Sequence, residues 1–167
     1  MADALTVFTP VERDVDELQA YLDALSPSVF ERLEMLHLAR VQIFHSLVHQ
    51  GPRQRRTDTL RVPQLVFTST YDGSLDDYLD ALRIRVPEAD EWWGRCPGYP
   101  GRDDAAAFGA YVTTHAIRTS LWASAIPGAT VADVREALAL RERVLDFAVA
   151  AQGLDAAALH ERFRAGF

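Results

Sequence analysis

Lysine is absent from this 167-residue chain, and all 17 of its basic residues are arginine. The 24 acidic residues outnumber them, so the net charge at pH 7 is −7. Because binding to nucleic-acid phosphates needs a basic face, this balance argues against nucleic acid as a partner. The single basic run, Arg53–Arg56, follows the turn-forming pair Gly51-Pro52 and fits a solvated hairpin tip better than a binding patch.

Cysteine is nearly absent as well, since Cys96 is the only one. A lone cysteine allows no internal disulfide and no cysteine-based zinc site. No apolar run approaches the roughly 20 residues of a membrane span, and the first residues lack the basic region and long apolar run of a signal peptide. We therefore expect a cytoplasmic protein with no membrane partner and no metal site.

Apolar patterning predicts the secondary structure. Runs rich in β-branched and aromatic residues, bounded by turn-forming residues, predict four strands: Ala4–Thr9, His37–Val48, Gln64–Thr70 and Phe108–His115. Apolar residues at helical spacing predict helices from Val15 and from Leu75, then a long helix over Val131–Gln152 and a short one over Asp155–Phe163. Asp14, Ser74 and Thr130 are the expected N-caps. The length fits one domain over residues 1–167, with a helical extension over 130–167.

The order strand, helix, strand, strand, helix, strand is the split-βαβ order. It predicts an α+β fold, a ferredoxin-like βαββαβ sandwich of the dimeric α/β-barrel type with extra C-terminal helices. Both helices of such a sandwich cover one face of the sheet. The other face is buried against a second copy or a ligand, so we expect a homodimer.

Polar side chains are expected to gather on the uncovered face. Strand alternation assigns Ala39, Val41, Ile43, Phe108, Ala110 and Val112 to the covered face. The uncovered face then receives polar residues: Arg40, Gln42, Thr68 or Ser69, Tyr111, Thr113 and His115. Such a cluster is typical of a small-molecule pocket. The alternative is a polar dimer interface or a solvated open face.

His37 and Asp72 are expected to meet, because a hairpin sets the start of the second strand beside the end of the third. A carboxylate can orient an imidazole for general acid/base chemistry. In the alternative interpretation, Asp72 only favours the helix N-terminus that follows it. His115 is expected at the opposite end of the sheet, away from His37.

An aromatic, Pro- and Gly-rich loop over residues 88–101 contains Trp92 and Trp93. Loops held on a rigid scaffold often carry function, so we assign these two residues, with Tyr111 and Trp122, as apolar walls of the pocket. Ser74 and Cys96 have no base beside them in sequence, which argues against covalent catalysis.

Two segments together resemble a known family. They are FTSTYDGSLDDYL, from Phe67 to Leu79, and HAIRTSLWASAIP, from His115 to Pro127. They are similar to the strand-(F/Y)DG-helix motif and a later segment of a bacterial family of ferredoxin-like, dimeric α/β-barrel-related proteins of uncharacterised activity. Two shorter segments, Leu36–Arg40 and Cys96–Pro100, match the family more loosely. The positions that match the motifs are His37, Arg40, Asp72, Gly73, His115 and Trp122.

The resemblance itself carries no activity. Compact ferredoxin-like barrels often serve as cyclases, isomerases or oxygenases in secondary metabolism, so the predicted fold leads us to expect a cofactor-independent enzyme of this type, acting on a hydrophobic substrate. The predicted catalytic residues are His37, Arg40, Asp72 and His115. The predicted substrate-binding residues are Thr68, Trp92, Trp93, Tyr111, Thr113 and Trp122. Two alternatives remain open at this point: a heme-binding, peroxidase-like protein, and a non-catalytic dimeric binding module.

Overall fold

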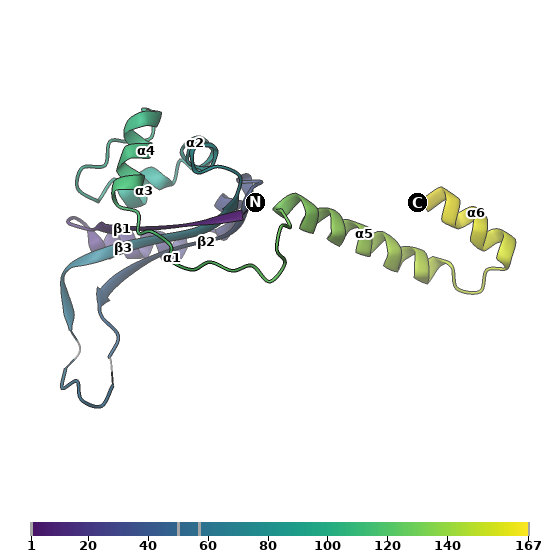
Figure 1. Ribbon diagram of the computed structural model, residues 1–167, viewed down its shortest axis with the longest axis horizontal. Helices are drawn as coiled ribbons and strands as arrows, with labels where there is room; N and C mark the ends of the chain where they lie inside the picture. The colour runs from purple at the N-terminus through teal and green to yellow at the C-terminus, as the bar shows by residue number, and fades with distance from the viewer. Residues whose placement is uncertain (1, 50, 57, 167) are drawn as a thin grey trace. The chain divides into compact units, whose positions relative to one another are not determined.

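The structure is a computed structural model that describes residues 2–49, 51–56 and 58–166 (Figure 1). The chain divides into two compact units, residues 1–128 and 129–167, and each is described by itself. The elements of the first unit are β1 (Ala2–Pro10), α1 (Val15–Ala24), the 3₁₀ helix η1 (Pro27–Arg32), β2 (Leu36–Ser46), β3 (Thr59–Asp72), α2 (Leu75–Arg85), α3 (Ala89–Trp93) and α4 (Ala105–Thr114). The second unit contains α5 (Val131–Ala150) and α6 (Ala156–Gly166).

The sheet has three strands in the order β1-β3-β2, and β3 runs antiparallel to both neighbours. The three strands predicted before residue 75 are therefore confirmed. β3 is longer than predicted, because it starts at Thr59 rather than at Gln64. After Asp72 the chain turns at Gly73, whose φ of 94° suits glycine. Ser74 then caps α2 by accepting a hydrogen bond from the Asp77 amide at 3.1 Å.

The predicted fourth strand is wrong, because residues 105–114 form helix α4. Asp104 caps this helix, and its side chain accepts a hydrogen bond from the Ala107 amide at 3.0 Å. Three alanines, the strongest helix formers, fill the first turn. Phe108, Tyr111 and Val112 are then buried at helical spacing, although Phe108 and Val112 also fit the two-residue period of a strand.

The fold is accordingly not the four-stranded βαββαβ sandwich that we predicted. Among the described residues, one isolated antiparallel bridge, between Val7 and Ala116, lies on the outer edge of β1. Two backbone hydrogen bonds flank it: the Phe8 amide donates to the His115 carbonyl at 3.0 Å, and the Ile117 amide donates to the Thr6 carbonyl at 2.8 Å. The edge of β1 is thus covered over only a few residues.

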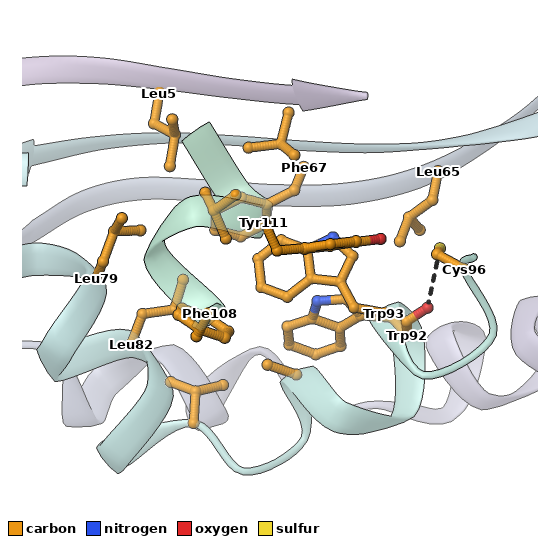
Figure 2. Close-up of a cluster of buried hydrophobic side chains, with 14 of the residues drawn as sticks. Leu5, Leu65, Phe67, Leu79, Leu82, Trp92, Trp93, Cys96, Phe108 and Tyr111 are labelled. Atoms are coloured by element: carbon orange, nitrogen blue, oxygen red, sulfur yellow. Dashed lines mark hydrogen bonds between the residues drawn. The ribbon is translucent and has the colours of Figure 1, made fainter. Parts of the chain in front are cut away.

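The core of the first unit lies between one face of the sheet and its helices. Helices α2, α3 and α4 lie on the same side of the sheet (Figure 1). Phe67 of β3 contacts Trp93 edge to face, with ring centroids 5.4 Å apart, and Trp93 contacts Phe108 at 5.7 Å. Leu18 of α1 belongs to the same buried cluster, part of which is drawn in Figure 2. The predicted covered-face residues of β2, Ala39, Val41 and Ile43, pack against this cluster.

The N-terminal ends of α1 and α5 differ in how they are capped. Asp14 occupies the predicted N-cap position of α1, but its side chain makes no capping hydrogen bond and its φ is 51°. The predicted cap at Thr130 is confirmed by reciprocal hydrogen bonds with Asp133, which form a capping box. In the second unit, α5 and α6 are joined through Gly153, with a φ of 76°, and Phe147 contacts Phe163 at 5.8 Å.

Candidate functional site

A β-bulge in β2 decides where His37 lies. Leu36 pairs with Tyr71 and Leu38 pairs with Thr70, so His37 is the extra residue between two consecutive pairs. Strict alternation would have put His37 on the face of Ala39, against the core. Leu36 instead packs on the core, and His37 turns to Asp72. The bulge therefore separates His37 from the face of Ala39.

The His37–Asp72 contact itself is confirmed. Nε2 of His37 lies 3.0 Å from Oδ1 of Asp72. The His37 side chain keeps 26% of its surface exposed and the Asp72 side chain keeps 13%, so the pair is partly shielded from water but still accessible. An ionised carboxylate only accepts hydrogen bonds, so Nε2 carries the hydrogen and Nδ1 of a neutral imidazole keeps its lone pair. Among the described residues, no hydrogen bond reaches Nδ1.

His37 lines a cleft of about 190 Å³ at one end of the sheet. Its walls come from three strands and from residues 117–128, which we call the post-α4 segment. The lining residues are Ala2, His37, Leu38, Thr70, Trp122, Ala123 and Ser124. Pockets for drug-sized ligands measure roughly 300–1,000 Å³, so this cleft suits a small molecule or one ring of a larger one.

Two other predicted residues lie near the cleft on the same sheet face. Arg40 pairs with Thr68, which is the next pair on this face after Leu38 and Thr70. Arg40 is exposed and Thr68 is half-buried, and neither lines the cleft. Trp122 does line it, with 36% of its surface exposed. Of the predicted site residues, His37 and Trp122 thus line the cleft, and Asp72 contacts His37. Arg40 and Thr68 lie one residue pair further along the same sheet face.

Sequence reasoning missed several cleft residues, chiefly Leu38, Thr70 and Ser124. Leu38 and Thr70 could have been found by extending the alternation of Arg40 and Thr68 by one pair toward Asp72. Ser124 belongs to the same quoted segment as Trp122. Nothing in the sequence pattern indicated that the post-α4 segment would lie over this end of the sheet.

The predicted aromatic walls lie elsewhere. Trp92 and Trp93 have no exposed surface and Tyr111 is 7% exposed, so all three belong to the core and not to the cleft (Figure 2). Trp92 and Trp93 are buried because α3 packs against the sheet, and Tyr111 is buried on α4 together with Phe108 and Val112. Burial also raises the pKa of the Tyr111 hydroxyl, which keeps it protonated.

Thr113 and His115 do not reach the cleft either. The Thr113 hydroxyl donates to the Gly109 carbonyl of its own helix at 2.8 Å. Nδ1 of His115 lies 2.9 Å from the Tyr111 carbonyl. The His115 carbonyl accepts a hydrogen bond from the Phe8 amide. Since Asp72 pairs with Ala2 at the other end of β1, the two histidines are separated by about 20 Å along that strand. The predicted separation of His37 from His115 is thus confirmed.

Neither Cys96 nor Ser74 is arranged as an activated nucleophile. Cys96 is 3% exposed, and its sulfur lies 3.3 Å from the Thr9 hydroxyl. Burial raises the pKa of this thiol, so it stays in the unreactive protonated form. The Ser74 hydroxyl donates to Asp77 at 2.6 Å and serves as a helix cap.

Within the described ranges, no group of three or more His, Cys, Asp or Glu side chains is arranged to hold a metal ion. Over the same residues, no helix has the length and apolar character that crossing a bilayer requires. No protein-family model, curated protein or solved structure matches the chain. The family resemblance of the Phe67–Leu79 and His115–Pro127 segments therefore stays a prediction.

Proposed function

We propose that this protein is a cofactor-independent acid/base enzyme that acts on a small, largely apolar molecule bound in the cleft beside His37. The observation that carries the proposal is the 3.0 Å contact between His37 Nε2 and Asp72 Oδ1 at a cleft that also contains Trp122. Asp72 orients the ring and fixes its tautomer, and Nδ1 is the proton acceptor.

The substrate is expected to present an apolar face and an acidic C–H or O–H group. Leu38 and Trp122 supply apolar surface to the cleft, whereas Thr70 and Ser124 supply hydroxyl groups that can bind a carbonyl oxygen. His37 would take the proton at one position of the substrate and return it at another, which is an isomerisation with no net change in atoms. Arg40, on the same sheet face, is the predicted cation that could attract an anionic intermediate.

The heme alternative gains no argument from this geometry. The cleft beside His37 measures about 190 Å³, which is below the range of pockets that enclose drug-sized ligands, so it does not suit a ligand as large as heme. A different observation, the exposed apolar surface of α5, favours the alternative of a dimeric binding module.

The test is deuterium exchange, which detects proton abstraction without knowledge of the product. The purified chain in D₂O is incubated with a panel of aryl ketones and β-diketones, and deuterium incorporation is followed by NMR. We expect the wild-type chain to accelerate exchange in at least one compound, and His37→Asn to lose about 100- to 10,000-fold of that rate. Asp72→Asn should lose part of it.

His45→Asn is the matched control, since His45 is exposed on the same strand but lies outside the cleft. Its exchange rate should equal that of the wild type. Exchange that survives His37→Asn would contradict the proposed base. A wild-type chain that exchanges no compound in the panel would contradict the proposal for carbonyl substrates.

A further inference from the structure

Helix α5 carries a straight line of exposed apolar side chains along one side. Its members are Val134, Leu138, Leu145 and Val149, which are 37%, 53%, 50% and 70% exposed. Their spacing of four, seven and four residues keeps them on one side of a helix with 3.6 residues per turn. We call these four residues the α5 seam.

Helix α6 does not cover the α5 seam. It packs on Phe147, through the contact of that ring with Phe163 at 5.8 Å. Phe147 lies two residues after Leu145, which is about 200° around the helix and so on the opposite side. A helix that is apolar on two opposite sides is normally covered on both.

We propose that the α5 seam binds the same seam of a second copy of this chain, with the two helices antiparallel. The sequence between Leu138 and Leu145 argues for this direction. Arg141 takes the central position that a heptad pattern assigns to the interface. In a parallel pair, Arg141 would face Arg141 of the partner subunit, placing like charges together in the core of the interface. In the antiparallel pair, it faces Leu138 of the partner subunit.

The charged residues beside the seam favour the same arrangement. Arg135 and Glu142 lie seven residues apart on one flank of α5. When Val134 faces Leu145 of the partner subunit, Arg135 comes opposite Glu142 of the partner subunit. The two-fold axis repeats the pair, so the interface gains two ion pairs of opposite charge.

The net charge of the second unit also permits self-association. Residues 129–167 contain six carboxylates and five arginines, for a net charge of −1. Residues 1–128 carry the remaining −6. Two copies of the second unit can therefore approach with little repulsion, whereas two copies of the first unit repel each other.

The first test is the mass of the full chain in solution, by light scattering after size exclusion. We expect about twice the chain mass of 18.6 kDa for the wild type, and a single-chain mass for Leu138→Glu and for Leu145→Glu. Leu140→Glu is the matched control, because Leu140 is 43% exposed but lies on the opposite side of α5. It should leave the mass doubled.

Two variant sets test the direction. Arg135→Glu should weaken the dimer, since it places like charges opposite each other, and adding Glu142→Arg should restore it. A mixture of Val134→Cys chains and Leu145→Cys chains should form an interchain disulfide under oxidation, whereas Val134→Cys chains alone should not.

A single-chain mass for the wild type would overturn the proposal and would mean that the seam is covered within one chain. A loss of the dimer in Leu140→Glu but not in Leu138→Glu would overturn the choice of surface. Self-linking of Val134→Cys chains would show a parallel pair and overturn the antiparallel arrangement.

Discussion

His37 would face the core if β2 alternated without interruption. The bulge between Leu36 and Leu38 moves it to the face of Asp72, and β-bulges are a common means of re-aiming a side chain next to a functional site. A bulge has no dependable signal in a single sequence, because the residues around it are ordinary strand residues. The meeting of His37 with Asp72 was nevertheless predictable, since the hairpin alone sets the two ends side by side.

The three tryptophans show that a sequence alone does not tell a buried core residue from one that lines a cleft. Aromatic residues in a Pro- and Gly-rich loop can be ligand walls or core, and composition does not separate the two. The outcome depends on whether the segment packs inside or outside the helix layer. Trp92 and Trp93 fall in a short helix beneath the sheet, whereas Trp122 follows the last helix of that unit and reaches the cleft.

We predict that Trp93→Ala and Trp122→Ala differ sharply in stability. Trp93 is fully buried and contacts Phe67 and Phe108, so its truncation should lower the free energy of unfolding by about 3–5 kcal/mol. Trp122→Ala should change it by less than about 0.5 kcal/mol. Urea unfolding measures both, and Trp93→Phe, which keeps a ring, should fall between them. Equal effects at the two positions would contradict the assignment of Trp93 to the core.

At the scale of elements, the apolar pattern of the sequence predicted three strands correctly. It wrongly predicted a fourth strand where the structure has α4. Phe108, Ala110 and Val112 fit the two-residue period, but Phe108, Tyr111 and Val112 also fit a helix. The deciding signal lies outside that run, in the Asp104 cap and the alanines after it. The error displaced Tyr111, Thr113 and His115 from the expected sheet face, which accounts for most of the mispredicted site.

The 3₁₀ helix η1 is held against the start of α3 by an ion pair. Arg32 donates two hydrogen bonds to Glu88, at 2.8 and 2.9 Å. Burial by itself would raise the pKa of Glu88, but the hydrogen bonds from Arg32 and from the backbone and the charge of Arg32 outweigh it. The pKa of the folded protein therefore lies below the ordinary value of 4.5.

A carboxyl group with a lowered folded pKa stabilises the protein above its ordinary pKa, and this contribution is lost as the pH falls through the folded value. We predict that Glu88→Gln lowers the free energy of unfolding at pH 7 by about 0.5 kcal/mol, a small figure because Arg32 is 46% exposed. The difference from the wild type should be smaller at pH 3, below the ordinary pKa of the carboxyl group, than at pH 7. Urea unfolding at both pH values measures it.

Glu34→Gln is the control for this pair, because Glu34 is 79% exposed and lies 3.6 Å from Arg85. It should have little effect at either pH. A Glu88→Gln difference that persists unchanged at pH 3 would show that the glutamate acts through its shape and not through its charge.

At the scale of the whole molecule, the two units differ in how they bury apolar surface. The buried cluster of the first unit draws on residues of that unit from Leu5 to Val112. The second unit has only Val131 buried among its described residues, and its helices expose apolar side chains along their length. The first unit thus has the core of an independent domain, whereas the second needs a partner surface.

This contrast predicts that a chain ending at Gly128 folds without the second unit. Its sheet and its core would be complete, so the near-ultraviolet circular dichroism of Trp92 and Trp93 should persist, and its urea midpoint should match that of the tryptophan signal in the full chain. The truncated chain should also have a single-chain mass, since it lacks the α5 seam.

Loss of the tryptophan signal on truncation would contradict this division and would show that α5 and α6 complete the core of the first unit. A truncated chain that keeps its fold but still has a doubled mass would instead place the dimer contact on residues 1–128, where the exposed face of the sheet around Leu38 and Arg40 would be the first surface to mutate.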